Sequence, residues 1–171
     1  MKTLLILGAG GYGKTIADVA EQIGGYDFIS FLDDGKTGDD IWGTCGQFSE
    51  FAKESIHMYP AFGNNTVRLQ WLRQLREAGI PVPTLVHPRA YVSPKAKLGM
   101  GTVVLPMAVV NTGVTAGDGC IFNIGALADH DSIFGDGVHL APGAIVKADN
   151  RIPEGMKIDS GVVIENRTYP L

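Results

Sequence analysis

The sequence predicts a small parallel α/β domain followed by a β-helix of hexapeptide repeats. Strand and helix signals alternate over residues 1–83, which is the pattern of a parallel sheet with crossover helices. From Val86 onward the helical signal stops and every sixth residue is apolar. We therefore expect an α/β domain at 1–83 and a repeat domain at 84–171.

The composition predicts a globular protein, and the charge gives no reason to expect a polyanionic partner. Of its 171 residues, 45% are hydrophobic and 19% are charged, and the net charge is −4. No block of Lys or Arg favours nucleic acid or an anionic membrane surface. The opening MKTLLILGAGG has an apolar run too short to span a bilayer, and this run ends in a glycine loop instead of a cleavage site. We expect a cytoplasmic protein with no membrane insertion.

Cysteine usage agrees with that compartment. Cys45 and Cys120 are too few and too far apart for a disulfide framework or a zinc site. We expect both thiols to be reduced and structural, and no bound metal.

Three apolar runs in the first domain are typical of buried strands: TLLIL (3–7), FISFL (28–32) and MYPAF (58–62). Helical spacing predicts helices at 14–22 and 66–78, with a mixed segment at 47–54 between them. Asn65 is expected to cap the second helix, and Gly79 is expected to end it.

The second domain has a strict period of six. Its apolar anchors are Val86, Val92, Leu98, Val104, Val110, Ala116, Phe122, Ala128, Phe134, Leu140, Val146, Ile152, Ile158 and Ile164. The residue four positions after an anchor is mostly small, as at Ala108, Ala126 and Ala144. Two inward positions in six fit the flat side of a triangular prism, with tight turns at its corners and three hexads in each coil. Residues 86–163 then make just over four coils.

A glycine loop joins the first strand to the first helix. The loop GAGGYG carries Gly8, Gly10 and Gly13 in the GxGxxG spacing, and Asp33 follows 20 residues after Gly13. This pattern alone favours NAD, but a domain of residues 1–83 holds half of a dinucleotide-binding sheet, which suits one nucleotide. The alternative is that these glycines only make a tight strand-to-helix turn.

The segments LVHPRAYVSPKAKLGMGTVV, LLILGAGGYGK, FLDD and FGNN together resemble one family. This family is the nucleotide-sugar N-acetyltransferases of the bacillosamine, perosamine and sialic-acid O-acetyltransferase type. The resemblance covers nearly the whole chain. It implies a left-handed parallel β-helix, a homotrimer and acetyl-CoA as the donor.

The resemblance also assigns a nucleotide site to the first domain. It implies that the residues contacting the nucleotide of an amino-sugar substrate are Gly10, Gly11, Gly13, Lys14, Asp33 and Asp34, with Gly63, Asn64, Asn65 and Arg68 as looser candidates. Glycines let the backbone approach a diphosphate at a helix start, and a carboxylate at a strand end accepts hydrogen bonds from a ribose or a base edge. The family often has His where this chain has Tyr12.

His130 is the third residue of the hexad ADHDSI (128–133), so it lies at a corner and points out of the prism. Two roles fit such a residue, a solvated corner or an active site. The family's catalytic histidine is followed by an acidic residue, so the resemblance assigns His130 as the catalytic base and Asp131, in place of the more usual Glu, as its partner. Acyl transfer to an amine needs a proton acceptor near neutral pH, and an imidazole oriented by a carboxylate suits this task.

Three further residues are assigned by the resemblance. Asn123 aligns with a family asparagine near the sugar, although a structural ladder at a coil corner accounts for it equally well. His139 and Ala148 are assigned to the acetyl-CoA site, where His139 aligns with the histidine near the acetyl donor.

The expected function is N-acetylation of a nucleotide-linked amino sugar, a cell-surface glycan precursor, by direct transfer from acetyl-CoA. Sugar O-acetylation and a non-catalytic nucleotide-sugar sensor remain open alternatives. An NAD oxidoreductase fits less well, because the chain lacks a second half-sheet. The sequence is equally compatible with uridine, guanosine and thymidine nucleotides.

Overall fold

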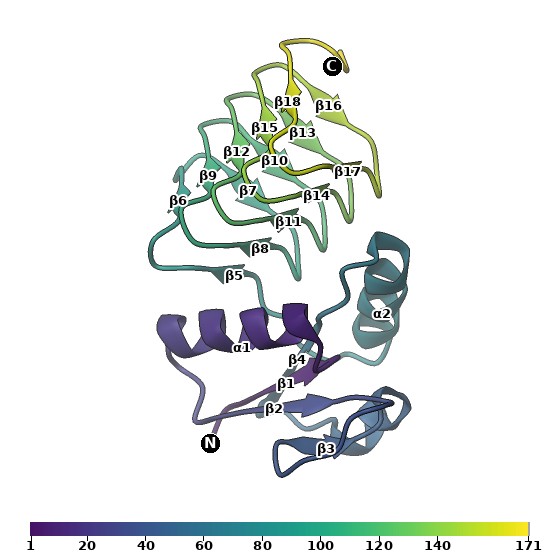
Figure 1. The fold of residues 1–171 in the computed structure, drawn as a ribbon. Helices are drawn as coiled ribbons and strands as arrows, with labels where there is room; N and C mark the ends of the chain where they lie inside the picture. Colours follow the sequence, from purple (N-terminus) through teal and green to yellow (C-terminus); the bar gives the residue numbers. More distant parts are fainter. Residues whose placement is uncertain (171) are drawn as a thin grey trace. The chain divides into compact units, whose positions relative to one another are not determined.

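The computed structural model describes residues 1–170, which form two compact units, Met1–Pro83 and a second unit that begins at Thr84 (Figure 1). The first unit is α/β and the second is a left-handed parallel β-helix, which confirms the predicted fold class. In the described part of the chain, no helix combines the length and the hydropathy that a membrane span requires.

The first unit is built on a four-stranded parallel sheet in the order β3-β2-β1-β4. β1 (Thr3–Leu7) lies between β2 (Phe28–Leu32) and β4 (Ile56–Pro60), and β3 (Ile41–Gly43) pairs with β2. Every residue of β1 is buried, because the strand has a neighbour on each side. This position explains its unbroken apolar run.

Two helices and a 3₁₀ segment complete the unit. α1 (Gly11–Ile23) packs against β1 and β2, and α2 (Asn65–Glu77) packs against β4. The 3₁₀ helix η1 (Cys45–Phe51) begins two residues before the predicted mixed segment and ends within it. The third predicted strand is observed two residues earlier, at β4, because its pairing with β1 sets the bounds.

The predicted cap of α2 is wrong by one residue. Asn64 has an extended backbone, with φ −74° and ψ 119°, and its side chain accepts the Val67 amide hydrogen at 3.1 Å. Asn65 is instead the first helical residue, and its Oδ1 accepts a hydrogen bond from Arg68 Nη2 at 2.8 Å. Gly79 follows the helix with φ +69°, as its predicted role requires.

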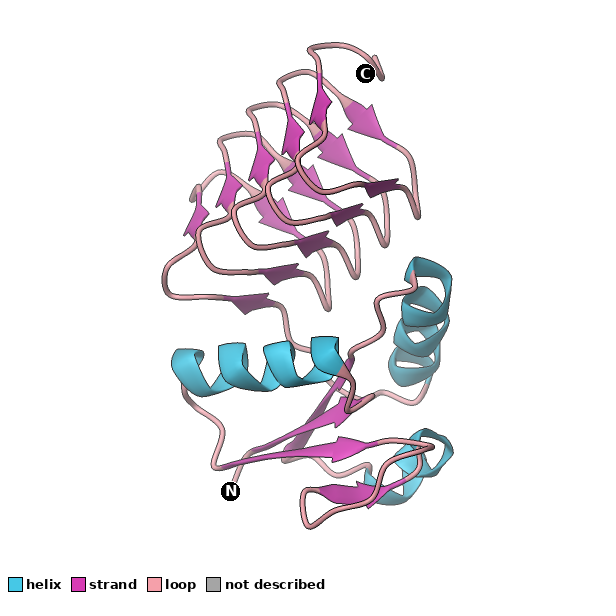
Figure 2. Ribbon diagram, viewed as in Figure 1, coloured by secondary structure: helices cyan, strands magenta, loops and turns pink. Residues whose placement is uncertain are grey.

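The second unit consists of two-residue strands joined by tight turns (Figure 2). The strands are β5 (Leu85–Val86), β6 (Tyr91–Val92), β7 (Lys97–Leu98), β8 (Val103–Val104), β9 (Val109–Val110), β10 (Thr115–Ala116), β11 (Ile121–Phe122), β12 (Leu127–Ala128), β13 (Ile133–Phe134), β14 (His139–Leu140), β15 (Ile145–Val146), β16 (Arg151–Ile152), β17 (Lys157–Ile158) and β18 (Val163–Ile164). Each strand ends at a predicted anchor.

Equivalent strands of successive coils pair in register and form three parallel sheets. Their orders are β16-β13-β10-β7, β17-β14-β11-β8-β5 and β18-β15-β12-β9-β6. Thr115, for example, pairs with Lys97 in the coil before it and with Ile133 in the coil after it. The repeat of one coil is therefore three hexads, as the sequence predicts.

The interior of the prism follows the predicted two positions in six. The anchors Phe122 and Phe134 are buried and meet edge to face, with ring centroids 5.3 Å apart. The second inward position holds small residues such as Ala126 and Ser132, both with no exposed surface. Large and small side chains thus alternate in the core of the narrow prism.

The corners impose a backbone constraint at the same period. Every sixth residue from Gly101 to Arg167 has a positive φ, between 57° and 72°. Glycine adopts this left-handed conformation without a steric penalty, and it occupies eight of these corners. The non-glycine corners are Met107, Asp131, Asp149 and Arg167. Asp is among the few residues that tolerate the conformation, because its short side chain can hydrogen-bond locally.

Both cysteines are free and buried. Cys45 Sγ lies 3.3 Å from the Leu32 carbonyl oxygen, to which it donates, and Cys120 Sγ donates to the Gly135 carbonyl at 3.2 Å. Burial, followed by the charges of Asp34 and Asp33, raises the pKa of Cys45 to about 11. Its thiol therefore stays protonated at neutral pH.

Candidate functional site

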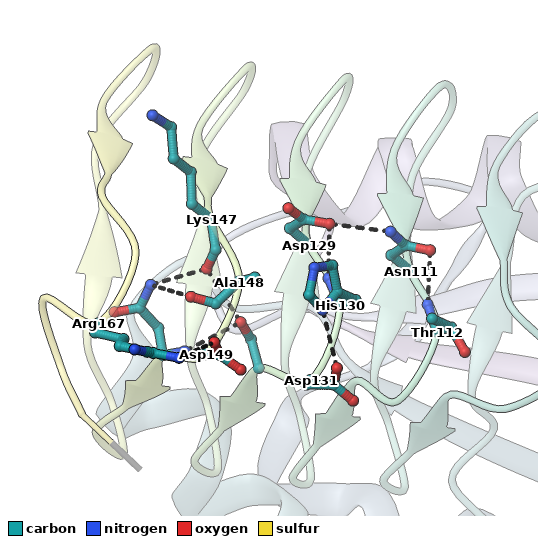
Figure 3. Close-up of polar contacts among 11 residues, drawn as sticks. Asn111, Thr112, Asp129, His130, Asp131, Lys147, Ala148, Asp149 and Arg167 are labelled. Carbon is teal, nitrogen blue, oxygen red and sulfur yellow. Dashed lines mark hydrogen bonds and ion pairs between the residues drawn. The ribbon is translucent and has the colours of Figure 1, made fainter.

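His130 and Asp131 form an exposed pair at a corner of the β-helix, between β12 and β13 (Figure 3). His130 Nδ1 lies 2.9 Å from Asp131 Oδ2, and the two side chains are 48% and 61% exposed. A neutral imidazole that donates from Nδ1 to a carboxylate keeps its Nε2 lone pair for another partner. The pair thus has the form of an oriented base at the protein surface.

A ladder of hydrogen bonds from the preceding coil supports this corner. The backbone amide of Asp131 donates to the Thr112 carbonyl at 3.1 Å. Asp129 Oδ1 accepts the His130 amide at 2.7 Å and Asn111 Nδ2 at 3.0 Å. These bonds hold the backbone on both sides of the His130 side chain, and Figure 3 shows those that Asp129 accepts.

The surrounding charges favour the protonated form of His130. The hydrogen bond to Asp131 is the largest effect and raises the pKa of His130 above its ordinary value. Desolvation is the next largest and lowers this pKa, whereas the charges of Asp129, Asp131 and Asp149 each raise it. Burial opposes ionisation of Asp129, but its hydrogen bonds from the His130 amide and Asn111 hold its pKa below the usual range. A raised pKa makes His130 a stronger base once the pH is high enough to deprotonate it.

The next coil presents a small side chain at the same corner, and two ion pairs connect it to the coil that follows. Ala148 lies one coil beyond His130 and is 2% exposed. Arg167 Nη2 meets Asp149 Oδ2 at 3.2 Å and partly compensates its charge. Lys147 Nζ meets Glu165 Oε2 at 2.6 Å. Lys147, Ala148, Asp149 and Arg167 therefore flank His130 on the side of the following coils (Figure 3).

Asn123 and His139 form a second polar pair, at another corner. Asn123 Oδ1 accepts the Ile124 amide hydrogen at 2.8 Å, so the Nδ2 end of the amide faces His139. The distance from Asn123 Nδ2 to His139 Nε2 is 3.1 Å. Because Nδ2 can only donate, Nε2 is the acceptor, and we assign the ring proton of His139 to the buried Nδ1.

The two pairs lie on different faces of one coil. His130 lies between β12 and β13, which belong to two different sheets, whereas His139 is in β14 of the third sheet. The structure thus brings together His130 with Asp131, and Asn123 with His139. The contact between Asn123 and His139 was not predicted from the sequence.

In the glycine loop of the first unit, Gly13 is closely packed, whereas Gly10 and Gly11 have no neighbouring atoms where a side chain would lie. A Cβ at Gly13 would overlap the Gly8 carbonyl oxygen, so Gly13 allows α1 to approach β1 closely. Gly10 and Gly11 have open space where a side chain would be, and α1 begins at Gly11. This arrangement leaves room for a ligand at the helix N-terminus. The Tyr12 hydroxyl lies 3.2 Å from that of Tyr59, and burial raises the pKa of Tyr12 well above its ordinary value.

Asp33 and Asp34 organise the loop that follows β2. Asp33 Oδ2 accepts the Ala9 amide at 2.7 Å, and its Oδ1 accepts the Gly35 and Lys36 amides at 2.9 Å. The amides of Ala9 and then Gly35 lower the pKa of Asp33. Asp34 Oδ1 accepts the Cys45 amide at 2.8 Å. Asp33 therefore ties the glycine loop to the next loop.

This second loop borders an open hollow of about 380 Å³. Its lining includes Asp33, Asp34, Lys36 and Trp42, whose side chain is 41% exposed. A neighbouring hollow of about 210 Å³ shares Lys36 and is also lined by Ala9 and Lys14. Lys36 and Trp42 were not predicted from the sequence, although an exposed tryptophan beside the FLDD motif is a signal that could have indicated them.

Arg68 supports the GNN loop from inside. Its side chain is fully buried, and Nη1 donates to the Phe62 carbonyl at 2.9 Å while Nη2 donates to Asn65. The buried Arg68 side chain therefore supports this loop, and its role as a looser candidate for the nucleotide site stays a prediction. Within residues 1–170, no cluster of three or more His, Cys, Asp and Glu side chains is arranged to hold a metal ion.

Residues 3–75 match the family described as the PglD N-terminal domain. The chain is 36% identical to the acetyltransferase domain of PglB from Neisseria gonorrhoeae FA1090, with a TM-score of 0.95 over 98% of this chain and 84% of that chain. A structure of that domain in complex with acetyl coenzyme A has a TM-score of 0.94, 36% identity and coverages of 97% and 83%. A histidine-to-asparagine mutant of perosamine N-acetyltransferase from Caulobacter crescentus, in complex with CoA and GDP-perosamine, is 25% identical, with a TM-score of 0.85 over 95% of this chain and 82% of that chain.

The Asn123–His139 contact predicts the tautomer of His139. Near neutral pH, the ring ¹⁵N shifts should be those of a neutral imidazole with its proton on Nδ1. Asn123→Asp should convert the ring to the doubly protonated form, because a carboxylate accepts at Nε2 where the amide donated. Asn123→Ala is the control, since it removes the donor without adding charge. A wild-type spectrum with the proton on Nε2 would contradict the assignment.

Proposed function

Because the chain belongs to the family of nucleotide-sugar N-acetyltransferases, we propose that it transfers the acetyl group of acetyl-CoA to the amine of a nucleotide-linked amino sugar. The observation that carries this proposal is the exposed His130–Asp131 pair with its raised histidine pKa. The relatives crystallised with acetyl coenzyme A, and with CoA and GDP-perosamine, support the two substrates. Such a product is a precursor for cell-surface glycans.

In the proposed reaction, His130 is the general base. Its Nδ1 hydrogen is held by Asp131, and its Nε2 accepts a proton from the sugar amine as the amine nitrogen bonds to the acyl carbon. The bond between carbon and sulfur then breaks, and the same proton passes from Nε2 to the departing CoA sulfur. Asp131 stabilises the imidazolium between these two transfers.

The first unit is assigned to the nucleotide. The backbone at Gly10 and Gly11 is open at the start of α1, where an anion such as a diphosphate is favoured. Lys14 and Lys36 line the hollow beside this loop and add positive charge. Asp33 can still share its carboxylate with a ribose or base, and Trp42 is the residue we assign to stack on the base.

The acetyl donor is assigned to His139 and to Ala148, which lies beside the proposed base. Asn123, which contacts His139, is assigned to the sugar. Within one chain, His130 and His139 lie on different faces of a coil. If both act in the same reaction, the two histidines of one site therefore come from two copies of the chain. A homotrimer would then hold three composite sites between its subunits. The exposed side chains of Met107 and Ile124, 66% and 51% accessible, supply apolar surface for this contact.

The cytoplasm is the proposed location. Two free, buried thiols suit a reducing compartment, where disulfides are rare. Fractionation of cells that express the protein, with detection in the soluble fraction, tests this assignment.

A transfer assay with acetyl-CoA and a panel of nucleotide sugars tests the activity. We expect amide formation on amino sugars linked to one of the uridine, guanosine or thymidine diphosphates, and no reaction with the matching hydroxy sugars. Transfer to hydroxyls alone would make the protein an O-acetyltransferase. Tight binding of a nucleotide sugar without turnover would indicate a sensor instead of an enzyme.

His130→Ala should lower turnover by about 10² to 10⁴-fold with little loss of stability, because an exposed corner residue contributes little to the core. If the sites are composite, His139→Ala should also be inactive, and subunit exchange between the two variants should restore part of the activity. Exchange can be verified by mass spectrometry of tagged subunits. No recovery after verified exchange would place both histidines in a single-chain site, and wild-type activity of His130→Ala would remove it from the mechanism.

The nucleotide assignment predicts the effect of two substitutions in the first unit. Asp33→Ala and Trp42→Ala should each weaken binding of the nucleotide sugar about tenfold, a loss of about 1.4 kcal/mol, and leave acetyl-CoA affinity unchanged. Trp42→Phe is the matched control, because it keeps an aromatic face. Calorimetry with each ligand measures both effects. Equal affinities in wild type and Trp42→Ala would exclude Trp42 from the site.

A further inference from the structure

Gly113 lies one coil before Asp131, at the same corner of the β-helix. Both residues have a left-handed backbone, with φ +72° at Gly113 and +57° at Asp131. The Asp131 amide bonds to the carbonyl of Thr112, which fixes the stacking of the two corners. The side chain of Asp131 therefore meets the preceding coil at Gly113.

The Asp131 carboxylate occupies the space that a side chain at Gly113 would need. A Cβ built on Gly113 would overlap Asp131 Oδ1 and lie 3.3 Å from Asp131 Cγ. The other oxygen, Oδ2, holds His130 Nδ1 at 2.9 Å. In the Asp131 carboxylate, Oδ1 thus lies against Gly113 and Oδ2 orients the His130 ring.

The obstruction at Gly113 is the movable end of a side chain. Added bulk can be accommodated when the Asp131 carboxylate rotates away, while the backbone keeps its course. This rotation separates Asp131 Oδ2 from His130 Nδ1. A side chain added at position 113 therefore removes the hydrogen bond that orients the His130 ring.

We propose that Gly113 is a positioning residue for the base: the absence of a side chain there lets the Asp131 carboxylate lie where it orients His130. The inference rests on the proposed role of His130 in acetyl transfer. The charged groups around the ring are Asp129 and Asp131 on its own corner and Asp149, paired with Arg167, in the next coil. The corresponding residues of the preceding coil, Asn111, Thr112 and Gly113, are uncharged.

The chain offers a matched control for the backbone strain of a substitution. Gly155 has φ +69° at a different corner, and a Cβ there has open space. Gly113→Ala and Gly155→Ala therefore share the strain of a left-handed alanine, whereas only Gly113→Ala displaces the Asp131 carboxylate. Comparable losses in Tm are expected for the two variants.

The test measures the NMR titration of the His130 ring without substrates, together with the pH profile of kcat. Gly113→Ala should lower the titration midpoint of the His130 ring and shift the acidic limb of the kcat profile to lower pH. It should also reduce the plateau of kcat about 10 to 10²-fold and leave KM unchanged. Gly155→Ala should leave all four quantities at their wild-type values. When Asp131→Asn is already present, adding Gly113→Ala should cause no further change in the midpoint, because the carboxylate is then absent.

Equal titration midpoints and profiles for Gly113→Ala and Gly155→Ala would overturn the proposal. If Gly113→Ala does not fold, Gly113→Asn and Gly155→Asn replace the pair, because Asn adopts the left-handed conformation more readily. Failure of both Gly113 variants beside folded Gly155 variants would give Gly113 a general structural role and also overturn it. If Gly113→Ala lowers the His130 titration midpoint but His130→Ala keeps wild-type activity, Gly113 positions the His130 ring and His130 is not the catalytic base.

Discussion

The register between coils is the constraint on which the β-helix depends. Each short strand pairs in parallel with the equivalent strand of the next coil, as Leu127 does with Val109 and Ile145. Because this pairing repeats without a shift from β5 to β18, the chain must turn at the same three places in each coil. As a result, the corners have a left-handed backbone at every sixth residue from Gly101 to Arg167, and the interior has fixed large and small positions.

Stacked corners convert a repetitive scaffold into an ordered surface for chemistry. An exposed side chain on a loop is usually mobile, but Asp129, His130 and Asp131 are held by backbone bonds to the neighbouring coil. The same stacking brings three carboxylates around one imidazole. The fold therefore supplies both the orientation and the electrostatic environment of the proposed base, although the side chains of His130 and Asp131 are exposed.

The repeat made the β-helix predictable from the sequence, whereas single side-chain contacts were not. The period of six located every strand anchor and put His130 at an outward corner, because period alone decides which residues face inward. The cap at Asn64 depends on the backbone angles of one residue, and the hollow beside Trp42 depends on the course of a loop. The contact between Asn123 and His139 depends on the orientation of one amide, which no hydrophobic pattern encodes.

The state of the two thiols matters for a protein proposed to handle a thioester. Thiolates exchange acyl groups with thioesters, so a reactive cysteine near the donor could divert the acetyl group onto the protein itself. Cys45 is kept neutral by burial and by its acidic neighbours, and Cys120 is enclosed within the prism with no exposed surface. The fold thereby protects the chain from self-acylation, and the donor's acetyl group is left for the sugar.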